Sequence, residues 1–237
     1  MIKYVLFDLD GTLNESGKGI KNSIRYALKK FDIIDETEQK INNLIGPPLV
    51  DGFREFYGLS EEDSKKAVTY YREYYGTKGK FECELYLGVS KMIKTLVEKG
   101  KKLVVCTSKP QGFTTEILKH VGVFQYFTFV QGATLDGSLS EKPEIIAKAL
   151  TELGIKESDA IMVGDRKFDV LGAKENGVKS VGVLYGYGDR QKLENSGADY
   201  IVESVKQLEK LGIKTFNELQ KIPKEKEINN FIRSTST

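Results

Sequence analysis

The sequence has a single histidine, two cysteines and no tryptophan among its 237 residues. A lone histidine, His120, argues against a histidine-based catalytic triad and against a zinc site built from several histidines. It lies in TTEILKHVGVF, where helical spacing and a following glycine predict the C-terminal end of a helix and favour a surface position over catalysis. Cys83 and Cys106 have no paired spacing, so we expect reduced thiols in a cytoplasmic protein. If this chain is an enzyme, carboxylates, lysines and hydroxyls must carry the reaction.

Long apolar runs and a large net charge are absent as well. The apolar runs VLF, LVVC and FTFV have the length of strands, and the N-terminus enters its first strand without a signal segment, so we expect no membrane partner. The formal net charge is +2, and the segment after Ile213 carries five basic and three acidic residues, which accounts for it. The main body is therefore near neutral, and a nucleic acid polymer is not an expected partner.

What the sequence does contain is an alternation of short apolar runs with longer segments of helical periodicity. The helical segments end in glycines, such as Gly100, Gly122 and Gly154. Strands are predicted at residues 2–8, 102–107, 126–130, 160–164, 179–184 and 199–202. This order predicts an α/β fold, with a Rossmann-like parallel sheet and helices on both of its faces.

One interval breaks the alternation. Between Thr12 and about Leu87 the sequence shows no convincing strand, only helical patterns at 19–31, 37–45, 49–57 and 61–75, with Ser60 as a candidate N-cap. We expect a four-helix-bundle cap over residues 14–85 and an α/β core over 1–13 and 86–213. A lid is expected because the insertion follows the first strand, where open α/β sheets bind ligands. Residues 214–237 are expected to be a frayed C-terminal extension, with at most a short helix around FNELQKI.

The stretch FDLDGTLN places Asp8 and Asp10 at the end of the first strand, followed by Gly11, which permits a tight turn. By itself this pattern also suits a turn in which an aspartate bonds its own backbone. A second stretch, MVGDRKFDV, places Asp165 at the end of another strand and Asp169 one helical turn later. Because parallel strands end at the same edge of a sheet, these carboxylates should converge. Such a cluster favours a bound Mg²⁺, which prefers oxygen ligands.

Two more segments complete a candidate site. KLVVCTSKP ends a strand with Thr107 and Ser108, whose hydroxyl and backbone N–H suit an anion, although ordinary helix capping explains them equally well. Lys142 directly precedes Pro143 at a helix start and follows the third strand, which directs it to the same edge. Carboxylates, a divalent cation, a lysine and anion-binding N–H groups are typical of phosphoryl transfer. GxxxxGK[ST] and GxGxxG are both absent, and LYGYGDR at 184–190 is predicted to be a loop.

The four stretches DLDGT, CTS, EKP and GDRKFD, in this order and spacing, resemble the four motifs of the haloacid dehalogenase superfamily. The resemblance covers roughly residues 1–212, and the insertion is similar to the superfamily's C1-type cap. GPPL, GATLDGS and VGVLYGYG look most like a bacterial branch described as 5′-nucleotidase-like or phosphoglycolate phosphatase-like.

The resemblance implies a Mg²⁺-dependent phosphatase and a role for each motif residue. Asp8 would be the nucleophile and Asp10 the general acid and base. The phosphate would be held by the backbone near Leu9 and by Thr107, Ser108 and Lys142. Mg²⁺ would be held by Asp8, Asp165 and the Asp10 carbonyl, with Asp169 in support. The dehalogenases themselves lack an acid two residues after the nucleophile and use no metal, so Asp10 favours phosphate chemistry.

Several alternatives share parts of this pattern. A phosphomutase has all four motifs and differs in its cap residues, and a phosphonate-cleaving enzyme would need a Schiff-base lysine from the cap. A signalling receiver is about half this length and accepts phosphate on an aspartate after a later strand; a non-catalytic binding module would not need both Asp8 and Asp10.

The sequence leaves the substrate open between nucleoside 5′-monophosphates, phosphoglycolate and other small phosphate esters. Candidate residues that read the leaving group are Gly46-Pro47-Pro48, Arg54, Lys109 and Tyr70, Tyr71, Tyr74 and Tyr75, although tyrosines at helical spacing usually pack within a bundle. Some of these tyrosines could instead stack on a nucleobase. Arg166 has no role that the sequence explains. We expect a monomer or a homodimer.

Overall fold

The computed structural model describes residues 2–34, 36–42, 44, 45 and 49–213. Its centre is a six-stranded sheet in the order β5-β4-β1-β6-β7-β8, in which all neighbouring strands are parallel. The strands are β1 (Tyr4–Phe7), β4 (Lys102–Pro110), β5 (Phe127–Ala133), β6 (Ala160–Gly164), β7 (Lys179–Val183) and β8 (Tyr200–Val202). The predicted parallel α/β sheet is confirmed.

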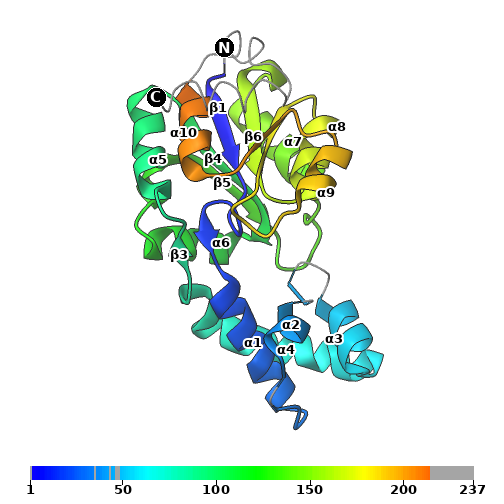
Figure 1. Ribbon diagram of the computed structural model, residues 1–237. Coiled ribbons are helices and arrows are strands. Elements are labelled where there is room, and N and C mark those ends of the chain that lie inside the picture. The colour runs from blue at the N-terminus through cyan, green and yellow to red at the C-terminus, as the bar shows by residue number, and fades with distance from the viewer. Residues whose placement is uncertain (1, 35, 43, 46–48, 214–237) are drawn as a thin grey trace, which may run out of the picture.

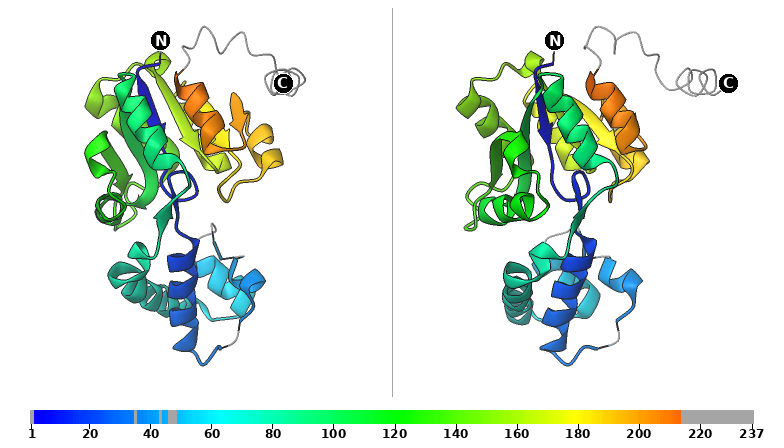
Figure 2. Two further views of the ribbon diagram at one scale, coloured as in Figure 1. Left: turned by 60° about the vertical axis from the view of Figure 1, so that its left-hand side comes forward. Right: turned by 90° about the vertical axis from the view of Figure 1, so that its left-hand side faces the viewer.

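Helices cover both faces of this sheet, as Figures 1 and 2 show. Alternate residues of a strand point to opposite faces, so Val5 and Phe7 of β1 pack in one hydrophobic core and Leu6 packs in the other. The first core contains α5 (Val89–Glu98), α6 (Gln111–His120) and α10 (Val205–Ile213), and the second contains α7 (Lys142–Leu153) and α8 (Lys167–Glu175). The short helix α9 (Arg190–Asn195) follows β7. His120 is the last residue of α6, as predicted.

The strand order brings three strand ends together. The chain leaves β1 for β4 and β5 on one side, and then crosses over to β6 on the other side of β1. The carboxyl ends of β4, β1 and β6 therefore lie side by side at the point where the direction of winding reverses. Open α/β sheets bind their ligands at such a switch point.

Four helices form a separate layer beyond the carboxyl ends of the strands (Figures 1 and 2). They are α1 (Gly17–Lys29), α2 (Glu38–Asn42), α3 (Leu49–Tyr57) and α4 (Glu61–Thr77), and they share a hydrophobic core that includes Ile24, Leu28 and Phe53. The N-terminus of α4 is capped by Ser60, whose hydroxyl accepts a hydrogen bond from the Asp63 N–H. We refer to α1–α4 and the short 3-10 turn Gly79–Phe81 as the cap.

Two elements correct the sequence-based prediction. The interval from Thr12 to Leu87 does contain strands, because β2 (Asn14–Glu15) and β3 (Glu84–Leu85) pair antiparallel and connect the cap to the sheet. Strands of two residues are too short to show the period of two on which strand prediction relies. β4 also continues to Pro110 rather than ending at residue 107, with an irregularity in its pairing between Cys106 and Pro110.

Some predictions fall outside the described residues, namely Gly46-Pro47-Pro48 and the possible helix around FNELQKI. Within the described part of the chain, every helix is too short or too polar to cross a lipid bilayer.

Candidate active site

The loop after β1 is shaped by backbone hydrogen bonds. The Asp8 N–H donates to the Val163 carbonyl of β6 at 2.9 Å, and the Leu9 carbonyl accepts from the N–H groups of Thr12, Leu13 and Asn14. Gly11 has φ +80°, and a Cβ there would lie 2.3 Å from Asp165 Oδ2. Only glycine therefore allows this loop to pass so close to Asp165.

Three aspartates meet at the carboxyl ends of β1 and β6. One carboxylate oxygen each from Asp8, Asp165 and Asp169 lies within 4.8 Å of the others, and all three side chains are buried. Asp8 and Asp165 follow adjacent strands, while Asp169 lies in the first turn of α8. The convergence expected from the parallel sheet is thus present in the structure.

Lys142 supplies the positive charge inside this cluster. It is buried at the start of α7, and its Nζ donates to Asp8 Oδ1 at 2.9 Å and to the Cys106 carbonyl at 3.1 Å. The same Nζ lies 2.8 Å from Asp169 Oδ1. One ammonium group thus bridges two of the three carboxylates and is also tied to the end of β4.

The negative charge of Asp165 is compensated less well than the charges of Asp8 and Asp169, which both pair with Lys142. Asp165 accepts hydrogen bonds from the Thr12 hydroxyl at 3.3 Å and from the Tyr187 N–H at 2.9 Å, and it forms no ion pair among the residues that the structure describes. Burial, followed by the charges of Asp8 and Asp169, raises the pKa of Asp165 to about 8. Burial also raises the pKa of Asp169, although Lys142 opposes the shift.

This donor set fits a hard divalent cation. Three buried carboxylates face one another, and among the described residues Lys142 is paired with two of them, Asp8 and Asp169. Asp165 has no ammonium partner there, and burial together with the two neighbouring carboxylates raises its pKa. Oxygen-only ligands of this kind suit Mg²⁺.

Thr107 and Ser108 lie next to this cluster along the chain, at the end of β4. They directly follow Cys106, whose carbonyl binds Lys142, and they fall within the irregular pairing of β4 and β5. Such irregularities re-aim side chains near active sites. The Thr107 side chain is buried and accepts a hydrogen bond from the Lys109 N–H at 3.3 Å, whereas Ser108 is exposed.

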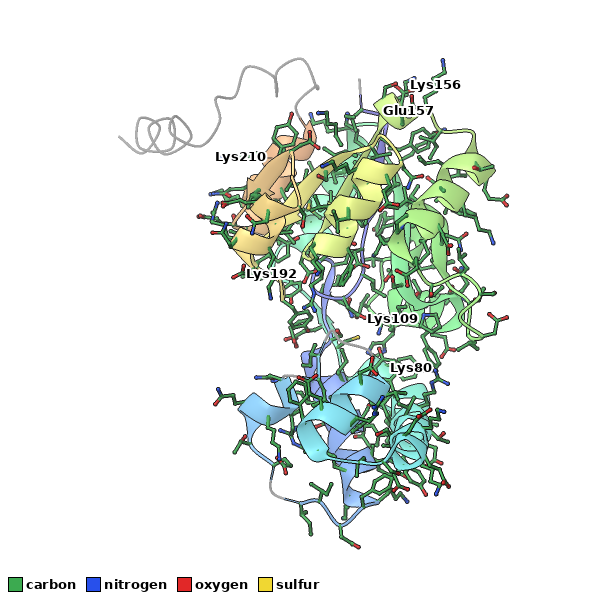
Figure 3. All side chains as sticks on the ribbon, turned by 90° about the vertical axis from the view of Figure 1, so that its right-hand side faces the viewer. Lys80, Lys109, Lys156, Glu157, Lys192 and Lys210 are labelled. Atoms are coloured by element: carbon green, nitrogen blue, oxygen red, sulfur yellow. The ribbon has the colours of Figure 1, made fainter. Side chains whose placement is uncertain are left out.

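Asp10 lies on the side of the site that faces the cap. Its Oδ2 is 2.7 Å from Lys109 Nζ, while its Oδ1 is buried and has no hydrogen-bond partner among the described residues. Lys109 also donates to the Tyr75 hydroxyl of α4. Burial lowers the pKa of Lys109, but the charge of Asp10, the nearby Tyr75 and Tyr71 hydroxyls and the hydrogen bond to Asp10 together outweigh it and hold the pKa above its ordinary range. Figure 3 shows Lys109 at the junction between sheet and cap.

The loop at residues 184–188 belongs to the site as well, which sequence reasoning missed. A Cβ at Gly186 would lie 1.9 Å from the Gly11 carbonyl oxygen, and a Cβ at Gly188 would lie 1.6 Å from that of Asp165. Between them, Tyr187 binds Asp165 through its N–H, while its hydroxyl donates to Glu15 Oε1 at 2.9 Å. The available signal was the glycine alternation in LYGYG, since glycine at every second position suggests close backbone packing.

Of the described candidate residues that would read a leaving group, Lys109 and Tyr75 lie at Asp10 and Tyr71 stacks on Tyr75, whereas Arg54, Tyr70 and Tyr74 lie elsewhere. Arg54 is exposed on α3, where it lines an open surface hollow. Tyr70 packs against Phe31, and Tyr74 packs against Tyr26, which is the bundle packing that helical spacing favours. Arg166, at the start of α8, donates its N–H to Asp169 at 3.0 Å.

Comparison with known proteins agrees with this arrangement. A family model described as "Haloacid dehalogenase-like hydrolase" matches residues 5–183. A 5′-nucleotidase from Pseudomonas aeruginosa is 38% identical over 189 residues, which cover 80% of this chain and 86% of that protein. The tyrosine-protein kinase PtkA from Mycobacterium tuberculosis is 34% identical, with 84% of this chain and 68% of that protein covered. The crystal structure of a "predicted phosphatase" from Clostridium acetobutylicum has a TM-score of 0.81 and 46% identity, over 89% of this chain and 98% of that one.

Proposed function

This chain belongs to the haloacid dehalogenase-like hydrolase family and is a phosphatase of that family, and on this premise we propose that it hydrolyses small phosphate monoesters through an aspartyl-phosphate formed on Asp8. The observation that carries the proposal is the buried cluster of Asp8, Asp165 and Asp169 around Lys142 at the switch point of the sheet.

Asp8 is the proposed nucleophile. An attack by its carboxylate on phosphorus splits one difficult step into two easier ones. Lys142 lies 2.9 Å from Asp8 Oδ1, which orients the carboxylate, and its ammonium group neutralises charge on the phosphoryl oxygens. Thr107, the Ser108 N–H and the backbone near Leu9 are proposed to hold those oxygens.

Asp10 is the proposed general acid, and its Oδ1, which has no hydrogen-bond partner among the residues described, is the atom that would give a proton to the departing alkoxide. The same carboxyl group then takes a proton from the water that hydrolyses the aspartyl-phosphate. Mg²⁺, held by Asp8, Asp165 and the Asp10 carbonyl with Asp169 in support, would lower the repulsion between the phosphate and the carboxylates.

We propose that residues 14–85 form the cap domain and that residues 1–13 and 86–213 form the core domain. The cap covers this site. Its α4 reaches Asp10 through Tyr75 and Lys109, and covering a site in this way excludes water from a reactive acyl phosphate. The free thiols of Cys83 and Cys106 support a cytoplasmic enzyme.

The test is release of inorganic phosphate from a panel of esters, with Mg²⁺ or with EDTA. The panel comprises nucleoside 5′-monophosphates, phosphoglycolate, sugar phosphates and p-nitrophenyl phosphate. We expect turnover that EDTA removes, and Asp8→Asn should remove it while the protein stays folded. Turnover by Asp8→Asn would contradict the covalent mechanism.

The kinase among the relatives makes phosphoryl transfer from ATP a second candidate. Incubation with γ-labelled ATP separates the two activities. Hydrolysis releases the label as inorganic phosphate, whereas a kinase would place it on a tyrosine, where it survives acid and base treatments that cleave an aspartyl-phosphate.

A further inference from the structure

Lys109 is a buried cation at the junction between the cap and the sheet, as Figure 3 shows. Its side chain is only 8% exposed, and within the described chain its one ion-pair partner is Asp10, at 2.7 Å. A lysine is seldom buried without a specific reason, since removing its charge from water is costly. Lys109 forms no ion pair with the nucleophile or the carboxylate cluster among the described residues, where the pairing lysine is Lys142.

The cap side of Lys109 is made of aromatic rings. Its Nζ lies 4.5 Å from the Tyr75 ring centroid, and Tyr75 stacks on Tyr71 with 8° between the ring planes. From the sheet side, Phe113 of α6 meets Tyr75 edge-on. These contacts engage the Tyr75 ring, so it is part of a wall around Lys109 and is poorly placed to stack on a nucleobase. Because Lys109 donates to the Tyr75 oxygen, the Tyr75 hydroxyl hydrogen stays available for an acceptor.

In the proposed reaction, the leaving group lies next to Lys109 and the Tyr75 ring. Its oxygen must come within hydrogen-bond distance of Asp10, and Asp10 Oδ1 is the oxygen that has no partner in the described part of the chain, since Oδ2 is held by Lys109. The atoms next to that oxygen therefore lie beside Asp10, close to Lys109 and the Tyr75 hydroxyl.

We propose that the natural leaving group carries an anion, a carboxylate or a second phosphate, which Lys109 and the Tyr75 hydroxyl bind. This inference rests on the proposed phosphatase function and narrows its substrate class to phosphate esters with a second negative charge near the scissile oxygen. A neutral nucleoside would place uncharged atoms against the buried ammonium group and gain nothing from it. An anion gives the ammonium group a second partner and forms a charge-assisted hydrogen bond with it.

The experiment compares two esters of similar size, phosphoglycolate, which carries a carboxylate, and 2-hydroxyethyl phosphate, which is neutral at that position. Lys109→Met removes the charge. It should lower kcat/KM for phosphoglycolate about 100-fold, mainly through KM, and for the neutral ester by a much smaller factor, which reflects the lost ion pair with Asp10. Lys109→Arg keeps the charge and should retain the preference for the anionic ester.

Lys80→Met is the matched control. Lys80 is also buried at this junction (Figure 3), but it pairs with Glu116 and lies over the Phe113 ring rather than next to Asp10. It should change the rates of both esters by the same factor. Thermal unfolding of each variant shows whether it is folded.

The outcomes separate the inference from the function on which it rests. An equal loss on both esters in Lys109→Met overturns the inference, because Lys109 then acts only on Asp10. A wild-type preference for the neutral ester or for a nucleoside monophosphate also overturns it, although the phosphatase function stands. If the wild type hydrolyses no ester at all, p-nitrophenyl phosphate included, both fail.

Discussion

Asp165→Asn should make the metal-free protein more stable and at the same time remove its response to Mg²⁺. The pKa of the Asp165 carboxyl rises from 3.8 to about 8 on folding because it is buried beside two other carboxylates. Each pH unit between these values corresponds to about 1.4 kcal/mol. Ionisation of Asp165 therefore lowers the free energy of unfolding by at most about 5–6 kcal/mol at pH 8. Asparagine has nearly the same shape and can still accept the Tyr187 N–H bond, but it carries no charge.

The direction in which stability changes with pH follows from the linkage between proton binding and folding. A carboxyl group with a raised pKa in the folded state stabilises the fold fully below its unfolded pKa and loses that stabilisation as the pH rises through its folded pKa. Wild type and variant should therefore be equally stable near pH 4 and diverge up to about pH 8. Because local relaxation reduces the upper limit, we expect the variant to be about 2–4 kcal/mol more stable there in EDTA, or roughly 5–12 °C higher in Tm.

The assay is thermal and urea unfolding of both proteins between pH 4 and 8.5, in EDTA and in MgCl₂. Mg²⁺ should stabilise the wild type increasingly with pH and leave the variant nearly unchanged, since the cation and the protons compete for the same carboxylate. Other titrating groups affect the wild type and Asp165→Asn alike, so the difference in their stability at each pH reports on Asp165 alone. Equal stability at pH 8 in EDTA, or equal stabilisation of both by Mg²⁺, would refute the electrostatic reasoning.

Three further substitutions test the rest of the site. Asp8→Asn should abolish turnover in the phosphate-release assay with the circular dichroism spectrum unchanged, because an amide is nearly isosteric but a poor nucleophile. Lys142→Met should lower the free energy of unfolding in EDTA by about 3–5 kcal/mol, since it leaves buried carboxylates unpaired, and added Mg²⁺ should recover part of the loss; no loss in urea unfolding would argue against the ion pairs. Gly188→Ala should weaken the Mg²⁺-dependent rise in Tm, because its Cβ would lie 1.6 Å from the Asp165 carbonyl oxygen; an unaltered rise would show that the loop can move aside.

The sheet and the carboxylate cluster could be predicted because each follows from local sequence pattern. Asp8 and Asp165 come directly after continuous apolar runs, and parallel strands bring the carboxyl ends of such runs to one edge. Lys142 was placed by the same reasoning, through the strand that precedes it and the proline that follows it. The general geometry of a parallel sheet was enough to bring these three residues together, and no individual side-chain contact had to be predicted.

The burial of Lys109, which the sequence named only as a candidate residue near the leaving group, and the contacts of Tyr187 show what the sequence could not predict. Lys109 is buried because Tyr75, 34 residues earlier, packs on it from a cap helix, and a lysine in isolation is expected on the surface. Tyr187 binds Glu15 across 172 residues of sequence, and nothing in the local pattern of either segment indicates the other. The β2–β3 pair was missed for a related reason, since its stability comes from pairing across the base of the cap rather than from residue propensity.

The hydrogen bonds of Tyr187 have a consequence for how such a protein can diversify. The Tyr187 hydroxyl accepts a hydrogen bond from the Ser16 N–H at 3.1 Å and donates one to Glu15, and the Tyr187 N–H binds Asp165. The residues that lead into α1 are therefore fixed to the same segment that binds Asp165. The cap helices have their own hydrophobic core, and among their described residues no comparable hydrogen bond to the segment at 184–188 is found beyond this point. Substitutions in the cap helices can change which leaving groups the cap accepts while the reacting carboxylates keep their positions. Substrate selectivity can therefore change without a change in the reaction.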